Sequence, residues 1–212
     1  MATNRNGIMG TCRGKIGPVI AYTWKGRQCM RGYNPWPVNP RTKKQQTNRS
    51  IFGTLSALAS NMSPATEIGL RDMADNQGKR PMHLFISLNR SCVSIDEDEV
   101  HVDYPSLTIA DGTLGKAEFG PLQNEGNCTV GVDFYTLAEA SHSDDDYVYL
   151  FAYEPFSKWS MLSFPVARNS CHASLALPGR WTGHEVHPYG FCWSQCWQKA
   201  SPSDYLGSII LN

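Results

Sequence analysis

Residues 14–40 read GKIGPVIAYTWKGRQCMRGYNPWPVNP, and we expect the rest of the chain to be organised around this stretch. It opens with a run of strand-forming residues, which are Val19, Ile20, Tyr22 and Trp24. Lys25-Gly26 is a turn signal, and Gln28–Met30 can run back antiparallel before three prolines prevent further regular structure. This predicts a two-stranded ribbon followed by an extended arm. A ribbon of this kind is marginal alone in water, so it must lie on its own body or on a neighbouring subunit.

Charge separates this region from the rest of the chain. The first 66 residues contain no Asp or Glu but ten basic residues, which are Arg5, Arg13, Lys15, Lys25, Arg27, Arg31, Arg41, Lys43, Lys44 and Arg49. The remainder holds nine basic and nineteen acidic residues, so a net charge of zero hides a front of +10 and a body of −10. This asymmetry indicates a basic arm for nucleic acid or for an acidic surface, such as the body of another copy; a solvated segregation of charge is the simpler alternative.

Length and composition set broad limits. A chain of 212 residues predicts one domain with appendages. No stretch is apolar enough to span a membrane, and the first residues lack the core of a secretory signal, so we expect a protein made and kept in the cytoplasm. The seven cysteines are odd in number and have no framework spacing, which favours reduced and mostly buried thiols.

Helical periodicity follows the arm. The first helix is expected between Pro40 and Asn61, with an apolar stripe of Ile51, Phe52, Leu55, Leu58, Ala59 and Met62. A second helix should begin at Ser63, acting as its cap, and end before residues 76–78. A third is expected over residues 81–93, although a strand is an open alternative for residues 84–88.

The period changes to two after about residue 100. Short strand-forming runs separated by turn signals are expected at residues 100–104, 107–110, 114–119, 128–135, 147–154, 161–168, 173–177, 185–193 and 205–211. Residues 148–153 (VYLFAY) also resemble residues 186–191 (VHPYGF), and Ser163 meets Ser201 at the same offset of 38. We read this echo as two related hairpins, one in each sheet of a β-sandwich, with alternating Phe or Tyr filling the sandwich core; a chance match is the alternative.

Several motifs resemble an uncharacterised family of Bacteroidota proteins. They are the G-K-I-G-P-V and W-K-G elements, the R-x-x-F step from Arg49 to Phe52, the Asp103-Tyr104 and Asp111-Gly112 pairs, the aromatic strand that ends in Arg168, and the L-P-x-x-W run ending at Trp181. The resemblance spans most of the chain and carries no catalytic residue with it. It implies a helical linker with an immunoglobulin-like sandwich, and it allows a phage or prophage setting.

A metal site is the sharpest candidate for chemistry. Cys192 and Cys196, with His184 and His187 before them, could bind zinc if the segment turned after Trp193. If it stays extended, residues four apart are about 13 Å from each other, which is too far for two thiolates on one ion. Buried or surface cysteines are therefore the favoured interpretation.

Candidates for catalysis are weaker. The acidic runs at residues 96–99 and 144–146 lack the glycine turn of a calcium loop, so we expect solvated turns. Ser170-Cys171-His172 places a thiol beside an imidazole, but neighbours on a strand point to opposite faces. No nucleophile elbow or phosphate-binding glycine loop occurs, and we predict a protein that is not an enzyme and holds neither metal nor cofactor.

The six tryptophans suggest a second class of site. Trp193 and Trp197 near a sandwich edge could stack on sugar rings or on a partner, although a role in the core is the favoured alternative. Nucleic acid would use the basic residues of the arm with Tyr33 and Trp36 between them. The acidic body would repel phosphates, so nucleic acid is allowed but not favoured.

Together these features predict a mainly β fold with a helical segment. We expect a basic arm with a β-ribbon (1–40), a linker of two or three short helices (41–95) and an immunoglobulin-like antiparallel β-sandwich (96–212). The predicted function is that of a structural subunit, in the first place a phage virion protein of the capsid or tail, which would locate it in the virion. A carbohydrate- or protein-binding module is the alternative.

The expected partners are further copies or other structural subunits, reached through the arm, and no membrane. The residues expected to make the contact are Lys15, Val19, Ile20, Tyr22, Trp24, Arg27, Arg31, Trp36, Arg41, Lys43 and Lys44.

Overall fold

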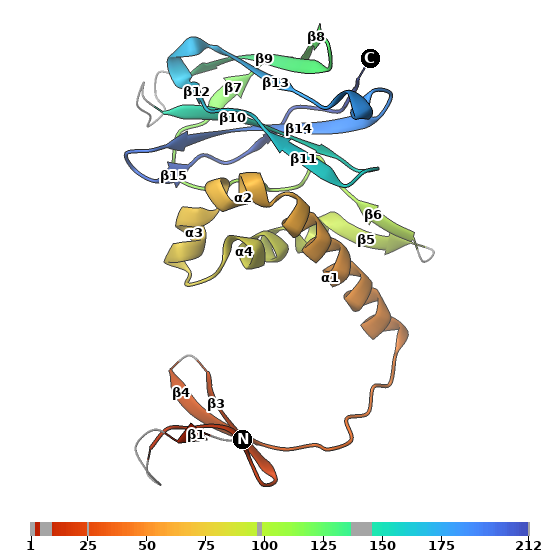
Figure 1. Cartoon of the computed structure of the whole chain (residues 1–212), viewed down its shortest axis with the longest axis vertical. Helices are drawn as coiled ribbons and strands as arrows, with labels where there is room; N and C mark the ends of the chain where they lie inside the picture. Colours follow the sequence, from red (N-terminus) through yellow and green to blue (C-terminus); the bar gives the residue numbers. More distant parts are fainter. Residues whose placement is uncertain (1–2, 5–9, 25, 97–98, 137–145, 212) are drawn as a thin grey trace. The chain divides into compact units, whose positions relative to one another are not determined.

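The computed structural model describes residues 3–4, 10–24, 26–96, 99–136 and 146–211. The chain divides into two compact units, residues 1–42 and residues 43–212 (Figure 1). The larger unit has three layers, which are two antiparallel sheets and a group of helices. Its helices and sheets confirm the predicted class of a mainly β fold with a helical segment.

The middle layer is a seven-stranded sheet with the central order β11-β10-β14-β15. Its strands are β10 (Tyr147–Glu154), β11 (Trp159–Leu162), β12 (Val166–Ala167), β14 (Glu185–Ser194), β15 (Lys199–Ala200), β16 (Asp204–Tyr205) and β17 (Ile209–Ile210). β12 also pairs with β10, while β16 and β17 pair with β14. Almost every residue of β10 and β14 is buried, because the sheet is covered on both faces.

The second sheet covers one face of the first. Its strands are β7 (Ala117–Phe119), β8 (Gln123–Gly126), β9 (Thr129–Thr136) and β13 (His172–Ala176), in the order β13-β9-β7 with β8 also on β9 (Figure 1). The core between the sheets is mostly aliphatic and includes Val130, Val132, Val148, Leu150, Leu175 and Cys192. The two sheets therefore form a sandwich, and its immunoglobulin-like topology stays a prediction.

Helices cover the other face of the middle sheet. They are α1 (Lys43–Asn61), α2 (Ser63–Gly69), α3 (Arg71–Asn76) and α4 (Pro81–Leu88), followed by the 3₁₀ helix η1 (Asn89–Cys92). Against them pack the alternating aromatic residues of β10 and β14, which are Tyr149, Phe151, Tyr153, Tyr189 and Phe191. The prediction that these rings fill the sandwich core is thus wrong, because alternation along a strand points them to the helical side.

The two echoed segments are neighbours in one sheet. β10 pairs with β14, from Tyr147 opposite Trp193 to Tyr153 opposite His187, so the expectation of one hairpin per sheet is wrong. Each strand leads through a turn to a short return strand, β11 or β15. The turns correspond at an offset of 40 rather than 38, since Lys158 and Gln198 both have positive φ angles of 58° and 54°.

The two serines of the echo have the same structural role. Ser163 Oγ accepts a hydrogen bond from Leu150 N at 2.9 Å, and Ser201 Oγ accepts one from Cys192 N at the same distance. Each serine N–H donates back to the carbonyl oxygen of that same strand residue. Both serines therefore close a hairpin by satisfying a buried backbone N–H and C=O pair.

The second predicted helix is broken into α2 and α3 at Leu70, which has φ and ψ of −115° and 1°. Ser63 is the first residue of α2 and makes no side-chain cap, so its predicted capping role is wrong. Residues 81–88 are helical, which excludes the strand alternative. None of the helices in the described part of the chain has the length and apolar character needed to cross a bilayer.

Residues 107–110 are not a strand, although their pattern predicted one. Asn89 Oδ1 accepts a hydrogen bond from Thr108 N at 2.7 Å, and Asn89 Nδ2 donates to Thr108 O at 3.0 Å. Ser203 Oγ accepts from the N–H groups of Ile109 and Ala110 at 3.0 and 3.2 Å. Side chains thus take the place of a partner strand, while Leu107 and Ile109 are buried among the helices.

A two-stranded hairpin, β5 (Val93–Asp96) with β6 (Glu99–Val102), lies beside α1. It contains the first acidic run, of which residues 97–98 are outside the described residues. The second acidic run, at residues 144–146, also differs from the prediction. Residues 144–145 are not described, but Asp146 is buried, with Oδ2 3.9 Å from Nη1 of buried Arg168. The expected solvated turn is therefore wrong for Asp146, because a distant arginine compensates its charge.

Candidate assembly surface

The N-terminal unit is built on a four-stranded antiparallel sheet in the order β1-β2-β3-β4. Its strands are β1 (Thr3–Asn4), β2 (Cys12–Ile16), β3 (Val19–Trp24) and β4 (Arg27–Gly32). The predicted ribbon corresponds to β3 and β4, but the expected number of two strands is wrong, because residues 12–16 also pair with β3. Gly17 and Gly26 occupy the turns with φ angles of 55° and 76°, which L side chains rarely adopt. Lys25, the other predicted turn residue, lies outside the described residues.

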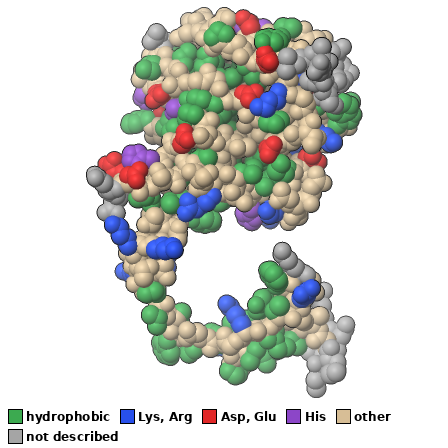
Figure 2. Space-filling model, turned by 180° about the vertical axis from the view of Figure 1, so that it is seen from behind, with side chains coloured by type: hydrophobic (Ala, Val, Ile, Leu, Met, Phe, Trp, Pro, Cys, Tyr) green, Lys and Arg blue, Asp and Glu red, His purple; other side chains and the backbone are tan. Residues whose placement is uncertain are grey.

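This sheet has almost no core of its own. Among the described residues of this unit, Ala21 alone is buried, with 2% of its surface exposed. Large apolar side chains are exposed instead, namely Ile16, Tyr22, Trp24, Met30, Tyr33, Trp36 and Val38. In the view of Figure 2, apolar and basic side chains gather on this unit and no Asp or Glu is visible on it. A surface of this composition is typical of one that contacts another molecule.

Alternation along the strands gives the sheet two different faces. Ile20 pairs with both Lys15 and Arg31, and Trp24 pairs with Arg27. The cationic face, as we call it, therefore carries Arg13, Lys15, Ile20, Tyr22, Trp24, Arg27, Cys29 and Arg31. The opposite face carries Ile16, Val19, Ala21, Thr23, Gln28 and Met30.

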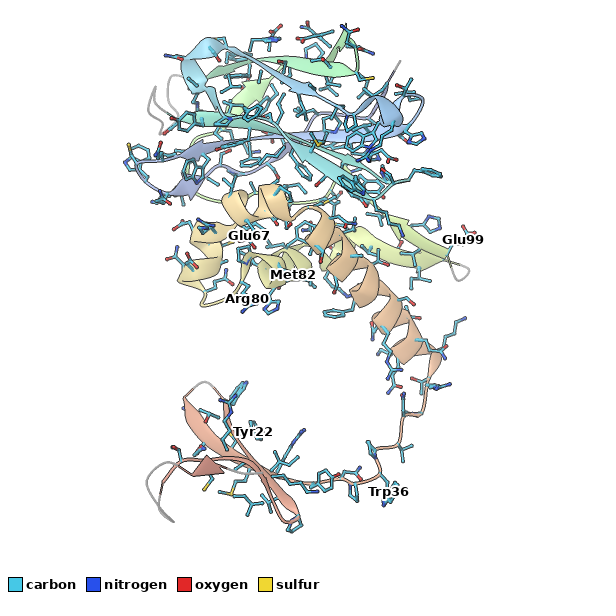
Figure 3. The ribbon with its side chains drawn as sticks, viewed as in Figure 1. Tyr22, Trp36, Glu67, Arg80, Met82 and Glu99 are labelled. Carbon is cyan, nitrogen blue, oxygen red and sulfur yellow. The ribbon has the colours of Figure 1, made fainter. Side chains whose placement is uncertain are left out.

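Most of the predicted contact residues are brought together on the cationic face. Arg13 was not among them, although the alternation of residues 12–16 could have identified it. Val19 belongs to the opposite face, and Trp36 lies in the segment after β4, where it projects with 83% of its surface exposed (Figure 3). Lys43 and Lys44 are not part of the sheet because they begin α1.

Tyr33 is a further residue that the sequence did not single out for assembly. Its ring lies under the Lys15 ammonium group, 3.5 Å from Nζ to the ring centroid, and its N–H donates to Pro18 O at 2.7 Å. The cation–π interaction ties the segment after β4 to β2, and the hydrogen bond ties it to the turn between β2 and β3.

The two tryptophans predicted as an aromatic surface differ in their surroundings. Trp193 is half-buried at the helical side of the sheet and stacks with Tyr147, with ring centroids 6.5 Å apart. Trp197 lies in the turn after β14 and is 48% exposed, and its backbone N–H donates to Ser194 Oγ at 3.4 Å. The exposed part of this candidate is therefore Trp197, and its binding role stays a prediction.

The candidate zinc ligands point in different directions. Cys192 is buried in the core between the sheets, where burial raises the pKa of its thiol, whereas Cys196 is exposed in the turn. His187 Nδ1 is hydrogen-bonded to Tyr205 Oη at 2.9 Å, and His184 Nδ1 lies 3.5 Å from Glu154 Oε1. Within the described residues, no three His, Cys, Asp or Glu side chains gather as a metal site.

An aromatic hollow beside α1 was not predicted. It has a volume of about 330 Å³, and its lining includes Tyr104, Tyr153 and Lys158. Burial raises the pKa of Tyr104 to about 12, and its ring stacks on His187 with centroids 4.1 Å apart. Burial also lowers the pKa of His187. A phenol with such a pKa stays protonated near neutral pH, so it can donate a hydrogen bond but is a poor general base.

His172 has acidic partners rather than its sequence neighbour Cys171. Its Nδ1 lies 2.7 Å from Asp133 Oδ1, and its Nε2 lies 2.9 Å from Glu125 Oε1. Hydrogen bonding to Asp133 raises the pKa of His172, and the same contact lowers the pKa of Asp133. The group is exposed on the outer side of the second sheet, where no nucleophile contacts the imidazole among the described residues.

No curated protein matches the chain. A family model with the description family of unknown function (DUF6266) matches residues 10–207. These residues include β2–β4 of the N-terminal sheet, the helices, and both sheets of the sandwich except β17. The expectation of an uncharacterised family is thereby confirmed, and the chain belongs to this family of unknown function.

Proposed function

We propose that the protein is a non-enzymatic structural subunit of an ordered assembly, in which the N-terminal unit docks on a neighbouring subunit. The observation that carries the proposal is a sheet that exposes its apolar side chains and buries only Ala21 among its described residues. A sheet needs a packed face for stability. Docking on a neighbour would supply that face.

The backbone of the sheet offers a second means of contact. Among the described residues, β4 pairs only with β3, so it is an edge strand. An edge strand can add to the sheet of another chain through main-chain hydrogen bonds, which give affinity without large side-chain pockets.

Charge supports a contact between copies. Residues 1–42 contain seven basic and no acidic residues, whereas residues 43–212 contain twelve basic and nineteen acidic ones. The two units therefore carry formal charges of +7 and −7. One N-terminal unit on one neighbouring body neutralises both, and such a head-to-tail contact builds rings or filaments.

The finer proposal is a virion protein of a phage capsid or tail, and it rests on the resemblance described above. Mass spectrometry of purified, nuclease-treated particles from cells that encode the protein tests it. Peptides from this chain at a stoichiometry comparable to that of known particle subunits would support the virion setting, and their absence would contradict it.

Assembly itself is tested by the solution mass of the full chain beside residues 43–212. The shorter chain retains both hydrophobic cores, which lie entirely within it, so it is expected to fold. Light scattering over a range of protein and salt concentrations should show assembly of the full chain only, weakened by salt. Equal monomeric masses for both proteins under every condition would refute the proposal.

A carbohydrate- or protein-binding module is the second candidate, favoured by the exposure of Trp197. It predicts a monomer whose tryptophan fluorescence changes on addition of a glycan. Loss of that change in W197A, but not in W36A, would support this function against assembly.

A further inference from the structure

The outer face of the second sheet has the opposite charge to the cationic face. Strands β7, β8, β9 and β13 contain no Lys or Arg. Burial alternates along β9, where Val132 and Phe134 face the core while Asp133 and Tyr135 are exposed. The acidic face, as we call it, is formed by Glu118, Glu125, Asp133, Tyr135, His172 and Ser174.

Hydrogen bonds hold the carboxylates of this face in place. Tyr135 Oη donates to Glu118, and His172 bridges Glu125 and Asp133. The Glu125 side chain lies over Gly131, where a Cβ atom would collide with its carboxylate. Three carboxylates thus stand on a sheet surface that keeps a partly exposed aromatic ring, Tyr135, beside them.

This face is the outer side of the sandwich in the described part of residues 43–212. The middle sheet has the helices on one face and the second sheet on the other, as Figure 1 shows for residues 43–212. Among the described residues of 43–212, the second sheet packs with its inner side chains only, so its outer side chains are available to another sheet. Two sheets stack face to face at a distance of about 10 Å.

We infer that the cationic face of one copy packs on the acidic face of a second copy. Arg13, Lys15, Arg27 and Arg31 would meet Glu118, Glu125 and Asp133, while Tyr22 and Trp24 would lie beside Tyr135. The inference rests on the proposed function and names the two surfaces that it uses. Tyr, Trp and Arg are the residues that dominate the energy of protein interfaces, and all three occur on the cationic face.

A second copy fits this face better than nucleic acid does. A basic sheet with exposed aromatic rings has the chemistry to bind single-stranded nucleic acid. Phosphates, however, would be repelled by the −7 charge of the body that each arm brings with it, whereas a second copy matches the +7 of the arm in a ratio of one to one.

Charge reversal of the full chain tests the contact. R27E/R31E makes the cationic face acidic, and E125K/D133K makes the acidic face basic. Each variant alone is expected to associate at least about tenfold more weakly than the natural chain, because like charges then oppose each other. An equimolar mixture should assemble again, since each altered face finds an opposite charge on the other variant. The control K79E/R80E makes the same change in net charge as R27E/R31E, but outside both faces, and it should assemble normally.

The outcomes separate the inference from the proposed function. Assembly by R27E/R31E, with loss of assembly in residues 43–212, would overturn the assigned face while the docking of the N-terminal unit stands. Assembly by E125K/D133K would overturn the acceptor face. Monomers for the natural chain would refute both proposals. Binding of a dT oligonucleotide by the natural chain and not by R27E/R31E, without assembly, would assign the cationic face to nucleic acid instead.

Discussion

Asn89 is expected to be one of the most sensitive single positions in the larger unit. Its side chain is fully buried and donates to Phe85 O and Thr108 O, each at 3.0 Å, and accepts from Thr108 N at 2.7 Å. N89A removes these three hydrogen bonds, together with a longer one that Cys92 Sγ donates to Asn89 Oδ1 at 3.8 Å, and it leaves the backbone N–H and C=O of Thr108 without this partner. At about 1 kcal/mol for each bond, the loss is about 3 kcal/mol in the free energy of unfolding.

Thermal and urea unfolding, followed by circular dichroism, measure this change. For a chain of this size, about 3 kcal/mol corresponds to a decrease in melting temperature of about 6–12 °C. The matched control is N169A, an exposed position for which we expect less than about 0.5 kcal/mol. If N89A were as stable as N169A, the side chain would not be the substitute for a partner strand that we describe.

Two further predictions concern charge and packing. The pKa of His172, followed by NMR, should lie above 6.5 and should fall in D133N. The stability that its carboxylate contacts contribute is present below pH 6.5 and is lost as the pH rises through the pKa of the folded state. An unchanged titration of His172 in D133N would contradict the contact. G69A should destabilise the chain by about 1–3 kcal/mol, because the new methyl group would lie 2.9 Å from Ala110 Cα. G53A, at an exposed position of α1 where the new methyl group meets no atom of another segment within 4 Å, should stabilise the chain by about 0.5–1 kcal/mol. Equal effects of the two substitutions would show that the close approach at Gly69 is absent.

Local sequence patterns were sufficient to predict strands β10 and β14 and the first helix. Residues 147–154 and 185–193 were predicted as strands and form β10 and β14, because strand-forming side chains between turn signals act over a few residues. The helix at residues 43–61 follows in the same way from apolar residues at helical spacing. Charge segregation is likewise a property of the sequence, and it led to the N-terminal unit as the candidate surface.

Other features depend on residues that are far apart in the chain. The sequence pattern places Asp146 in a solvated acidic turn, whereas in the structure it is buried beside Arg168. The pattern of residues 107–110 predicts a strand, whereas in the structure the side chains of Asn89 and Ser203, which are distant in sequence, bind their backbone groups. No local rule could have found these partners.

The sequence by itself therefore determined the mainly β class, the presence of a helical segment, the separate basic arm and the family. Tertiary structure alone decided that β10 and β14 lie side by side, that their aromatic rings face the helices, and that three carboxylates lie on one outer sheet face. The physical reason is the range of the forces involved. Secondary-structure propensity and the segregation of charge depend on residues that are close together in the sequence. Which face of a strand is buried depends instead on the layer that covers it, and that layer is made of residues far away in the chain.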